Sequence, residues 1–520
     1  MSIANRRYMP LIILAVLSLF IAVLRVHTYN EPFERDITSH AVIAHELLAG
    51  RSLYSDLWDS KPPAIFVTYA LGDLLAGYGP SQVYFIGVAA AIITLLGCYW
   101  AGSALGGVPG GLWTAAFWAV ICNDLWLWAN QPNIEVGMNA CLVWAFALMI
   151  RADRKKLQWQ RWLAIGGLFA LASVYKQVAV IFAVFLSLLH LLTCLRDSRT
   201  RKLAFLQICI IVAAGAAVWA GVFAFFALTG RFATFYDTIF TYGRWYAKSR
   251  GGNLLANIVE GFRYKRLFPI HMKSMPVLII FAVVGIIMGL WKGSRRNWLL
   301  LLGFALAAPF AIAITGRFYG HYYQLWLVPL VVGAGWAVSA TGPKGNSTAA
   351  LVRSAAGAVG LIILLCFVLP QHRLSADEWS ATKIGPQFVV SRSVVKEVDA
   401  LLEPGETLYV WGQNPEFYFW SGRRPPTGLI WSTDLMDDNP LAQKHTARAL
   451  EDLKRELPEI FVVNQLQFKV PLDHPVIRWA LVEKRYVPLP GNPDRGVLYG
   501  RPFFRIFVRR GGRLAARLGA

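Results

Sequence analysis

Charged residues are scarce in this sequence. Only 16% of its 520 residues are Asp, Glu, Lys or Arg, whereas 56% are hydrophobic, and the mean hydropathy is +0.46. A soluble globular protein of this length needs more polar surface, so that class is excluded. Apolar runs of about 17 residues or more recur between Leu11 and Cys366, and each is long enough to cross most of a bilayer core. The sequence therefore predicts an α-helical polytopic membrane protein.

Acidic residues and cysteines are also few. The chain has 30 Asp and Glu against 51 Lys and Arg, which gives a formal charge of +21. The basic residues form short clusters between apolar runs instead of one soluble face, which argues against a nucleic-acid partner. The cysteines lie in apolar segments, which disfavours a structural disulfide in an exported loop, and no spacing supports a zinc knuckle. They are Cys98, Cys122, Cys141, Cys194, Cys209 and Cys366.

The positions of the basic clusters predict the topology. Clusters at residues 6–7, 151–161, 196–202, 292–296 and 344–353 are expected to be cytoplasmic, because Lys and Arg concentrate in loops on that side. The outer side then receives residues 31–62, 175–177, 230–275, 316–324 and all that follows 370. The first apolar run is expected to be a signal anchor. The candidate spans are residues 11–24, 63–78, 83–105, 112–128, 136–150, 162–175, 178–195, 205–228, 277–291, 298–315, 325–340 and 355–369.

This topology contains a parity problem. Four apolar segments separate the outer loop that ends at Pro62 from the inner cluster that begins at Arg151, yet only an odd number of crossings fits. One segment must fail to cross. The Gly-rich turn at residues 106–111 makes its two neighbours the leading candidates for a re-entrant segment. We expect about eleven transmembrane helices in total.

The composition changes after Pro370. A helix-like stretch at residues 394–402 precedes strand-like runs at 407–411 and 459–463, with a polar helix at 440–457 between the two runs. We therefore expect a membrane domain at residues 1–370 and a small exported α/β domain at residues 371–520. The basic, partly apolar stretch 501–517 is expected to lie along a lipid surface.

The outer segments carry two notable carboxylates. Asp36 precedes an amphipathic stretch, residues 37–48, which we expect to lie in the interface plane and to hold Asp36 near lipid headgroups. Glu135 stands at the start of a span, where the helix dipole favours a negative charge. Its functional alternative is a catalytic-site carboxylate that faces the same cavity as Asp36 and positions the acceptor or supports the site. Each of them alone could be an ordinary loop or helix-terminal charge. Asp124, inside an apolar run, must point inward.

Basic and aromatic residues gather at the same predicted side. Lys176 falls between two apolar segments, where an interfacial lysine is the simpler alternative. Arg317, His321 and Tyr322 belong to the segment 316–323, which packs a cation, an imidazole and several phenols between two spans. Arginine presents a planar fork of donors that suits phosphate oxygens, so a lipid-linked phosphate is a natural partner. His40 and His45 have poor spacing for shared metal ligation on a helix.

These segments resemble the polyprenyl-phosphate-dependent glycosyltransferases of the GT-C superfamily, nearest the family 39 branch with its protein O-mannosyltransferases and aminoarabinose transferases. The resemblance rests on Arg35-Asp36, the segment 54–63, Asn133-Ile-Glu135, Lys176-Gln177 and the segment 317–322, and extends weakly to residues 410–418. The chain departs from the branch after Asp36, where Ile37 stands in place of a further acidic residue, and before Lys176, where Val174 and Tyr175 replace a small or apolar lead-in.

The resemblance implies roles for single residues. Asp36 matches the general base on the acceptor hydroxyl, and Glu135 matches the acidic position of the second outer loop. The residues that match donor-phosphate positions are Lys61, Lys176, Arg317, His321 and Tyr322. An inverting transfer agrees with this set, because one carboxylate deprotonates the acceptor while cations stabilise the leaving phosphate. A divalent metal at the site is left open.

We therefore expect an enzyme of the inner membrane whose active site faces the periplasm. Its partners would be a polyprenyl-phosphate sugar donor, membrane lipid, and an acceptor glycan, lipid or protein. Two alternatives remain open. A ligase would use a diphosphate-linked oligosaccharide, and a transporter would move lipid or sugar without transferase activity. The chain has no convincing internal repeat, and its notable charges lie at one face instead of the midplane, which disfavours a transporter.

Overall fold

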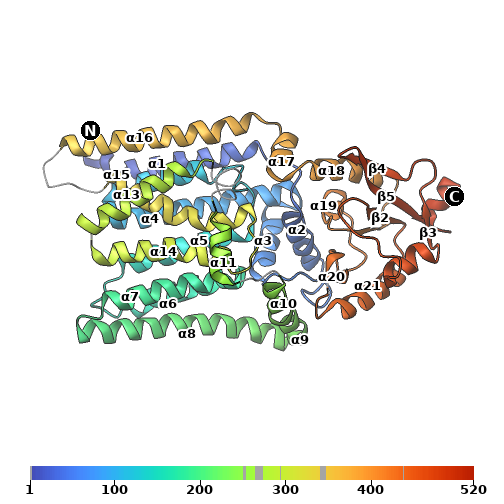
Figure 1. The fold of residues 1–520 in the computed structure, drawn as a ribbon, viewed down its shortest axis with the longest axis horizontal. Coiled ribbons are helices and arrows are strands. Elements are labelled where there is room, and N and C mark those ends of the chain that lie inside the picture. The colour runs from blue at the N-terminus through green and yellow to red at the C-terminus, as the bar shows by residue number, and fades with distance from the viewer. Residues whose placement is uncertain are drawn as a thin grey trace.

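A computed structural model describes residues 3–249, 253–263, 273–292, 294–339, 347–436 and 438–519. It confirms an α-helical membrane fold with a small C-terminal domain that contains a β-sheet. The helical bundle and the C-terminal domain lie end to end, with the N-terminus at the opposite end of the bundle from the domain (Figure 1). We call the end of the bundle that carries the domain the domain end, and the opposite end the far end. The loop 230–275 and the clusters 292–296 and 344–353 fall partly outside the described residues.

Long apolar helices form the bundle. Six described helices are long and apolar enough to cross a membrane: α1, α4, α5, α8, α14 and α16. Shorter apolar helices stand beside them. The helices of the bundle and its connections are α1 (Ile3–Val26), α2 (Arg35–Leu48), α3 (Ala64–Ala76), α4 (Pro80–Ile121), α5 (Ile134–Arg151), α6 (Trp159–Tyr175), α7 (Val180–Thr193), α8 (Ser198–Leu228), α9 (Phe232–Tyr236), α10 (Gly243–Lys248), α11 (Leu254–Gly261), α13 (Pro276–Lys292), α14 (Arg295–Ala313), α15 (Leu327–Ser339) and α16 (Ser347–Val368).

Basic clusters that are distant in sequence meet at the far end. Arg154 donates to the carbonyl oxygen of Thr193 over 3.3 Å, and Arg296 donates to that of Ile150 over 3.0 Å. These contacts join the connections α5–α6, α7–α8 and α13–α14. The cationic side chains thus satisfy carbonyl groups that helix ends leave without partners.

The helix α4 is a hairpin with two arms. Gly106 and Gly107 leave helical geometry, and Gly107 has a φ of 65°, a conformation that glycine adopts without steric cost. The turn lies at the far end, because a Cβ added at Gly106 would meet Ser339, the last residue of α15, at 1.8 Å. Both arms return to the domain end. Tyr84 of the first arm donates to Ala22 of α1 over 3.0 Å, and Arg25 donates to Cys122, just after the second arm, over 2.8 Å.

This arrangement corrects the expectation about the re-entrant segment. The neighbours of the Gly-rich turn both run from one end of the bundle to the other, so they do not solve the parity problem. The helix α3 does, because it begins after Lys61 and ends before Tyr84, both of which lie at the domain end. Its 13 residues extend over only about 20 Å, less than a bilayer core. We expected α3 to be a span because its sequence is apolar, although the helix is too short to cross a bilayer core.

The described C-terminal domain contains a five-stranded sheet. The strand order is β1-β2-β5-β3, with β1 and β2 parallel, β5 antiparallel to β2 and β3, and β4 paired with the remaining length of β5. The two predicted strands and the polar helix are confirmed with shifts of one or two residues at their ends, whereas the helix expected at 394–402 runs from Gln387 to Asp399. The elements are α17 (Ala376–Ile384), α18 (Gln387–Asp399), β1 (Leu408–Trp411), α19 (Glu416–Ser421), α20 (Thr433–Met436), α21 (Ala442–Glu456), β2 (Ile460–Asn464), α22 (Pro475–Ile477), β3 (Tyr486–Pro488), β4 (Asp494–Leu498), β5 (Arg501–Arg509) and α23 (Arg513–Leu518).

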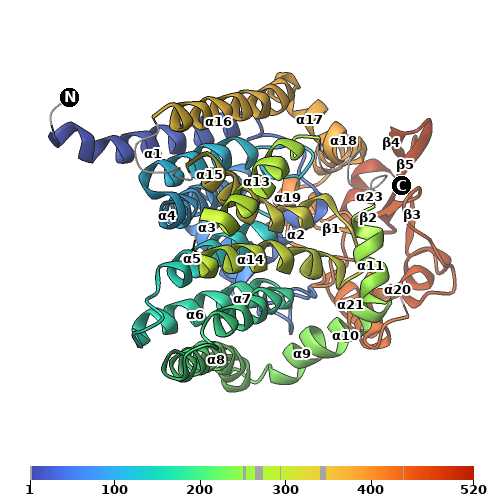
Figure 2. The same cartoon turned by 60° about the vertical axis from the view of Figure 1, so that its left-hand side comes forward.

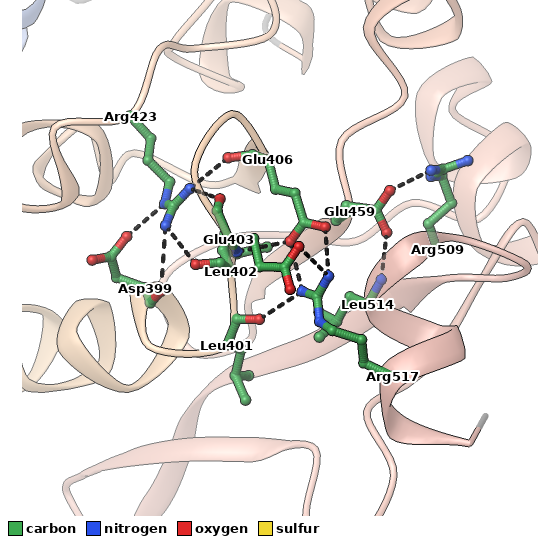
Figure 3. A network of polar contacts seen from close by, with 10 residues as sticks. All are labelled: Asp399, Leu401, Leu402, Glu403, Glu406, Arg423, Glu459, Arg509, Leu514 and Arg517. Carbon is green, nitrogen blue, oxygen red and sulfur yellow. Dashed lines mark hydrogen bonds and ion pairs between the residues drawn. The ribbon is translucent and has the colours of Figure 1, made fainter.

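The expectation that residues 501–517 lie on lipid is wrong. They form β5 and most of α23, and Phe504, Ile506 and Val508 are buried in the sheet with the alternation typical of a strand. The arginines of this stretch pair inside the domain. Arg517 binds Glu406 over 2.7 Å, and Arg509 binds Glu459, as Figure 3 shows. Charges that suggested a membrane surface therefore hold the C-terminal segment onto the domain.

A buried ion pair docks the domain onto the bundle. Lys383 of α17 lies 2.9 Å from Glu31, which follows α1, and both side chains are fully buried. Asn130 and Gln131, between α4 and α5, each donate to Glu31 over 2.8 Å. Three separate parts of the chain meet at this carboxylate. A charge pair without access to water is favourable only when its hydrogen bonds are complete, so these parts must dock together.

The Lys383→Ala variant tests this docking. It leaves Glu31 buried without its cation, and we expect a loss of about 3–5 kcal/mol in the free energy of unfolding. The melting temperature of the purified protein in detergent is the measurement. The exposed pair of Arg485 and Glu483 offers a control, because Arg485→Ala should cost less than about 1 kcal/mol. Equal melting temperatures for the two variants would contradict the buried pair as a docking contact.

Candidate active site

Asp36 lies in the first turn of α2, at the domain end. The expectation that this helix lies in the membrane interface is wrong, because residues 37–44 are all buried, beneath the C-terminal domain and against α3. Trp431 of the domain donates to Ser39 over 3.2 Å, and Arg35 donates to Gln413. The Asp36 side chain itself stays 29% exposed. The helix is therefore a rigid support with one accessible carboxylate.

Lys61 stands between two carboxylates. Its Nζ lies 3.4 Å from Asp36 Oδ1 and 3.2 Å from Asp59 Oδ1. Burial would raise the pKa of Asp36, but the nearby positive charges, with Lys61 foremost, together outweigh it and hold that pKa well below its usual range. The two carboxylates in turn raise the pKa of Lys61 against the effect of burial. Asp59 is almost fully buried, and the sequence analysis did not assign it to the site.

Glu135 and Lys176 form a second pair. Glu135 is in the first turn of α5, and its Oε1 accepts a hydrogen bond of 2.8 Å from Lys176 Nζ. Lys176 follows α6, where the backbone becomes extended before a short 3-10 turn (Gln177–Ala179). The ammonium also lies 3.6 Å from the centre of the Tyr322 ring, within the range of a cation–π contact. Lys176 is thus held by a charge and by an aromatic face.

The segment between α14 and α15 completes the cluster. A 3-10 helix (Gly320–Trp326) buries His321 and Tyr322. His321 Nε2 lies 4.0 Å from Glu135 Oε2. Arg317 lies over the ring of Tyr246, with 3.9 Å between the guanidinium carbon and the ring centre, and its buried Nε has no hydrogen-bond partner among the described residues. This nitrogen is a free donor for an anion.

Electrostatic coupling joins the two carboxylate pairs. Burial lowers the pKa of His321, against the opposing charges of Glu135 and Asp36. The neutral imidazole is therefore favoured, and the cations of the cluster are Lys61, Lys176 and Arg317. All seven residues that the sequence analysis selected thus meet at the domain end. Tyr246 of α10 lies close to these cations. Burial raises the pKa of its hydroxyl, and the charges of Arg317 and Lys61 oppose that rise.

Two buried groups beside Asp36 escaped the sequence analysis. Burial, followed by the charge of Asp36, raises the pKa of Glu34 to about 8, and its Oε1 has no described hydrogen-bond partner. His40, which the sequence marked as poorly spaced for metal ligation, is fully buried between Phe66 and Tyr69, and burial lowers its pKa to about 3. Both groups are held neutral. Among the described residues, no group of three or more His, Cys, Asp or Glu could hold a metal ion.

Asp124 is buried, as the sequence predicted, and the connection after α8 carries two further helices. Asp124 points inward, where it accepts from Ser274 and from the backbone nitrogen of Leu127 over 3.0 Å. The helices α9 and α10 lie at the domain end beside the C-terminal domain (Figure 2). Tyr242, just before α10, donates to Asp434 over 3.0 Å. The connection after α8 therefore walls the cluster from the side opposite α1.

The protonation of Glu34 predicts a pH dependence of stability. The folded protein keeps this proton up to about pH 8, whereas the unfolded chain releases it near pH 4.5. Stability should therefore fall as the pH rises between these values, by up to about 1.4 kcal/mol per pH unit. Glu34→Gln should flatten this part of the dependence. Melting temperatures from pH 5 to 9 measure it, with the exposed Glu483→Gln as control. A parallel pH dependence of Glu34→Gln and the wild type would contradict a neutral Glu34.

No protein-family model matches the chain, and no curated protein matches its sequence. Solved structures share its fold. ArnT from Cupriavidus metallidurans bound to undecaprenyl phosphate is 12% identical with a TM-score of 0.63, and the match covers 99% of each chain. The archaeal oligosaccharyltransferase AglB from Archaeoglobus fulgidus, in complex with an inhibitory peptide and a dolichol-phosphate, is 14% identical with a TM-score of 0.52, over 88% of this chain and 70% of AglB. The arabinofuranosyltransferase AftD from mycobacteria is 13% identical with a TM-score of 0.51, over 95% of this chain and 40% of AftD. The chain therefore has the fold of these membrane glycosyltransferases, the GT-C fold.

Proposed function

We propose that this protein is an inverting glycosyltransferase that moves a sugar from a polyprenyl-phosphate donor to an acceptor hydroxyl, in the manner of the family 39 branch. One observation carries the proposal. An accessible carboxylate, Asp36, lies 3.4 Å from the ammonium of Lys61 in the same cluster as Lys176 and Arg317. A base beside several cations is the arrangement that transfer from a phosphate needs.

The reaction is a single displacement. Asp36 takes the proton of the acceptor hydroxyl, whose oxygen attacks the anomeric carbon from the face opposite the phosphate. The bond between that carbon and the phosphate oxygen breaks as the new glycosidic bond forms, so the configuration inverts. Polyprenyl phosphate leaves with its charge balanced by Lys61, Lys176 and Arg317. No general acid is required, because phosphate is a good leaving group when cations surround it.

The donor also prepares the base. Lys61 lowers the pKa of Asp36, which makes that carboxylate a weak base while the pair is intact. A bound phosphate competes for the same ammonium, so the hold on Asp36 weakens and its proton affinity rises when the donor arrives. Asp59 keeps Lys61 in place during this exchange. Donor binding and base activation are thereby coupled.

Glu135 acts on the cations more than on the acceptor. Its side chain is 1% exposed, and it contacts Lys176 directly. It therefore positions Lys176 and His321, with Tyr322 supporting Lys176 from the ring face. We assign Glu135 to positioning, in place of the acceptor-side role that the second outer loop suggested.

The distribution of basic residues indicates which side of the membrane the site faces. The basic clusters at the far end favour a cytoplasmic position for that end. The domain end, with the cluster and the C-terminal domain, then faces the exterior side of the cytoplasmic membrane. Donor and acceptor would both meet the site at the outer leaflet.

Mass spectrometry of lipid-linked sugars and envelope glycans tests the function directly. Cells that lack the protein should accumulate one polyprenyl-phosphate sugar and lose one envelope modification. The purified protein in detergent should then consume that donor, which a transporter without a sealed compartment would not do. Accumulation of a diphosphate-linked oligosaccharide would instead identify a ligase.

Asp36→Asn tests the assignment of the base. The variant should fold and bind donor like the wild type, while turnover falls by about 10² to 10⁴, the range for the loss of a general base. Initial rates at saturating donor measure this effect. Asp73→Asn is the matched control, because Asp73 pairs with His45 over 2.8 Å and contacts none of the cluster. Turnover of Asp36→Asn near that of the control would reject Asp36 as the base.

Arg317→Ala tests the donor site. Loss of a charge-assisted contact to phosphate should weaken donor binding by about tenfold or more. Affinity for undecaprenyl phosphate, measured on the purified protein, is the readout. Arg485→Ala removes an arginine that also lies near an aromatic ring, 5.9 Å from Trp479, but in the C-terminal domain, so its affinity should not change. Unchanged affinity in Arg317→Ala would place the phosphate elsewhere.

A further inference from the structure

Residues 425–428 of the C-terminal domain contact the loop between α2 and α3. The carbonyl oxygen of Gly428 accepts from the backbone nitrogen of Trp58 over 3.0 Å, and that of Pro425 accepts from Arg51 over 3.2 Å. A Cβ added at Gly428 would lie 1.6 Å from the carbonyl oxygen of Asp56, so only glycine fits this contact. The backbones of the two parts thus touch directly, three residues before Trp431.

Trp431 reaches Lys61 by two routes. The centre of its ring lies 5.3 Å from Lys61 Nζ, within cation–π range. Its Nε1 donates to Ser39 Oγ over 3.2 Å, and Ser39 in turn donates to Asp59 Oδ2 over 3.1 Å. Asp59 accepts from the backbone nitrogen and from the ammonium of Lys61. The indole, the hydroxyl, the carboxylate and the ammonium therefore form a closed ring of contacts.

Each contact in this ring removes freedom from a flexible side chain. A lysine has four rotatable bonds, and fixing them at the moment of binding would weaken its hold on a ligand. Asp59 and Trp431 fix Lys61 beforehand, and Ser39 and Trp431 are 92% or more buried. The indole nitrogen is a donor only, so its bond to Ser39 also directs the serine hydroxyl toward Asp59.

We propose that Trp431 is a positioning residue that the C-terminal domain supplies to the donor-phosphate site, where it holds Lys61 in the orientation that binds the phosphate. This inference rests on the proposed function and deepens it. The domain becomes one wall of the donor site in place of a separate appendage. Docking of the domain and affinity for the lipid phosphate are then linked.

Binding of undecaprenyl phosphate to the full-length protein tests the proposal. Trp431→Phe keeps a ring but removes the indole nitrogen and weakens the cation–π contact, so affinity should fall about three- to tenfold. Turnover at saturating donor should also fall, by no more than about tenfold, because Lys61 balances the charge of the leaving phosphate as well. Trp479→Phe is the matched control. Trp479 is a buried tryptophan of the same domain that packs on Tyr486.

A second variant keeps the test decisive. Ser39→Ala breaks the hydrogen bonds that link Trp431 to Asp59. In the double variant with Trp431→Phe, the fold-loss in affinity should be smaller than the product of the two single fold-losses, because both residues act through Asp59. Wild-type affinity in Trp431→Phe would overturn the proposal, as would an equal loss in Trp479→Phe. A purely structural role for Trp431 would lower the melting temperature and leave affinity unchanged. Wild-type protein that does not bind the lipid phosphate would instead reject the proposed function.

Discussion

A single buried carboxylate holds the domain end of the molecule together. Glu31 receives Lys383 from the C-terminal domain and the amides of Asn130 and Gln131 from the loop between α4 and α5. Desolvation of a charge costs several kcal/mol, and only a complete set of partners offsets that cost. The loop after α1, the loop after α4 and helix α17 therefore assume their places together. Asp36 follows Glu31 by five residues, so its position depends on the same contact.

The same principle operates in the site, with one difference. The pairs Asp36–Lys61 and Glu135–Lys176 are partly accessible, so an anion can compete for their cations. Asp59 and Trp431 hold Lys61 from its buried side, and Glu135 and Tyr322 hold Lys176. The ammonium groups of Lys61 and Lys176 are thus each held in place on one side, while the other side stays open to a ligand. This combination suits a phosphate that must bind, lose its sugar and leave.

The sequence predicted what depends on local pattern. Hydropathy located the apolar helices, and short apolar runs located β1 and β2, because a strand buried on both faces is continuously hydrophobic. The residues Asp36, Lys61, Glu135, Lys176, Arg317, His321 and Tyr322 were found because charges at span ends are conspicuous. Asp59 was overlooked although it stands only two positions before its partner Lys61. Trp431 was missed because its partner Ser39 lies 392 positions away in the chain. No local pattern reports such a contact.

Two errors have a common cause. The helix α3 is as apolar as a span but only 13 residues long, and the flanking residues Lys61 and Tyr84 both lie at the domain end. The stretch 501–517 is basic, but its arginines pair with Glu459 and Glu406. Composition indicated a membrane in both cases. Contacts with residues distant in the sequence decide where each segment lies, and composition contains no information about such contacts.

The most direct measurement is an experimental structure of the protein with undecaprenyl phosphate bound. We expect the phosphate to lie between Lys61, Lys176 and Arg317, within hydrogen-bonding distance of at least two of them, with the Asp36 carboxylate facing the space where a sugar would sit. A phosphate bound at the far end of the bundle, or on the C-terminal domain away from Lys61, would contradict this expectation.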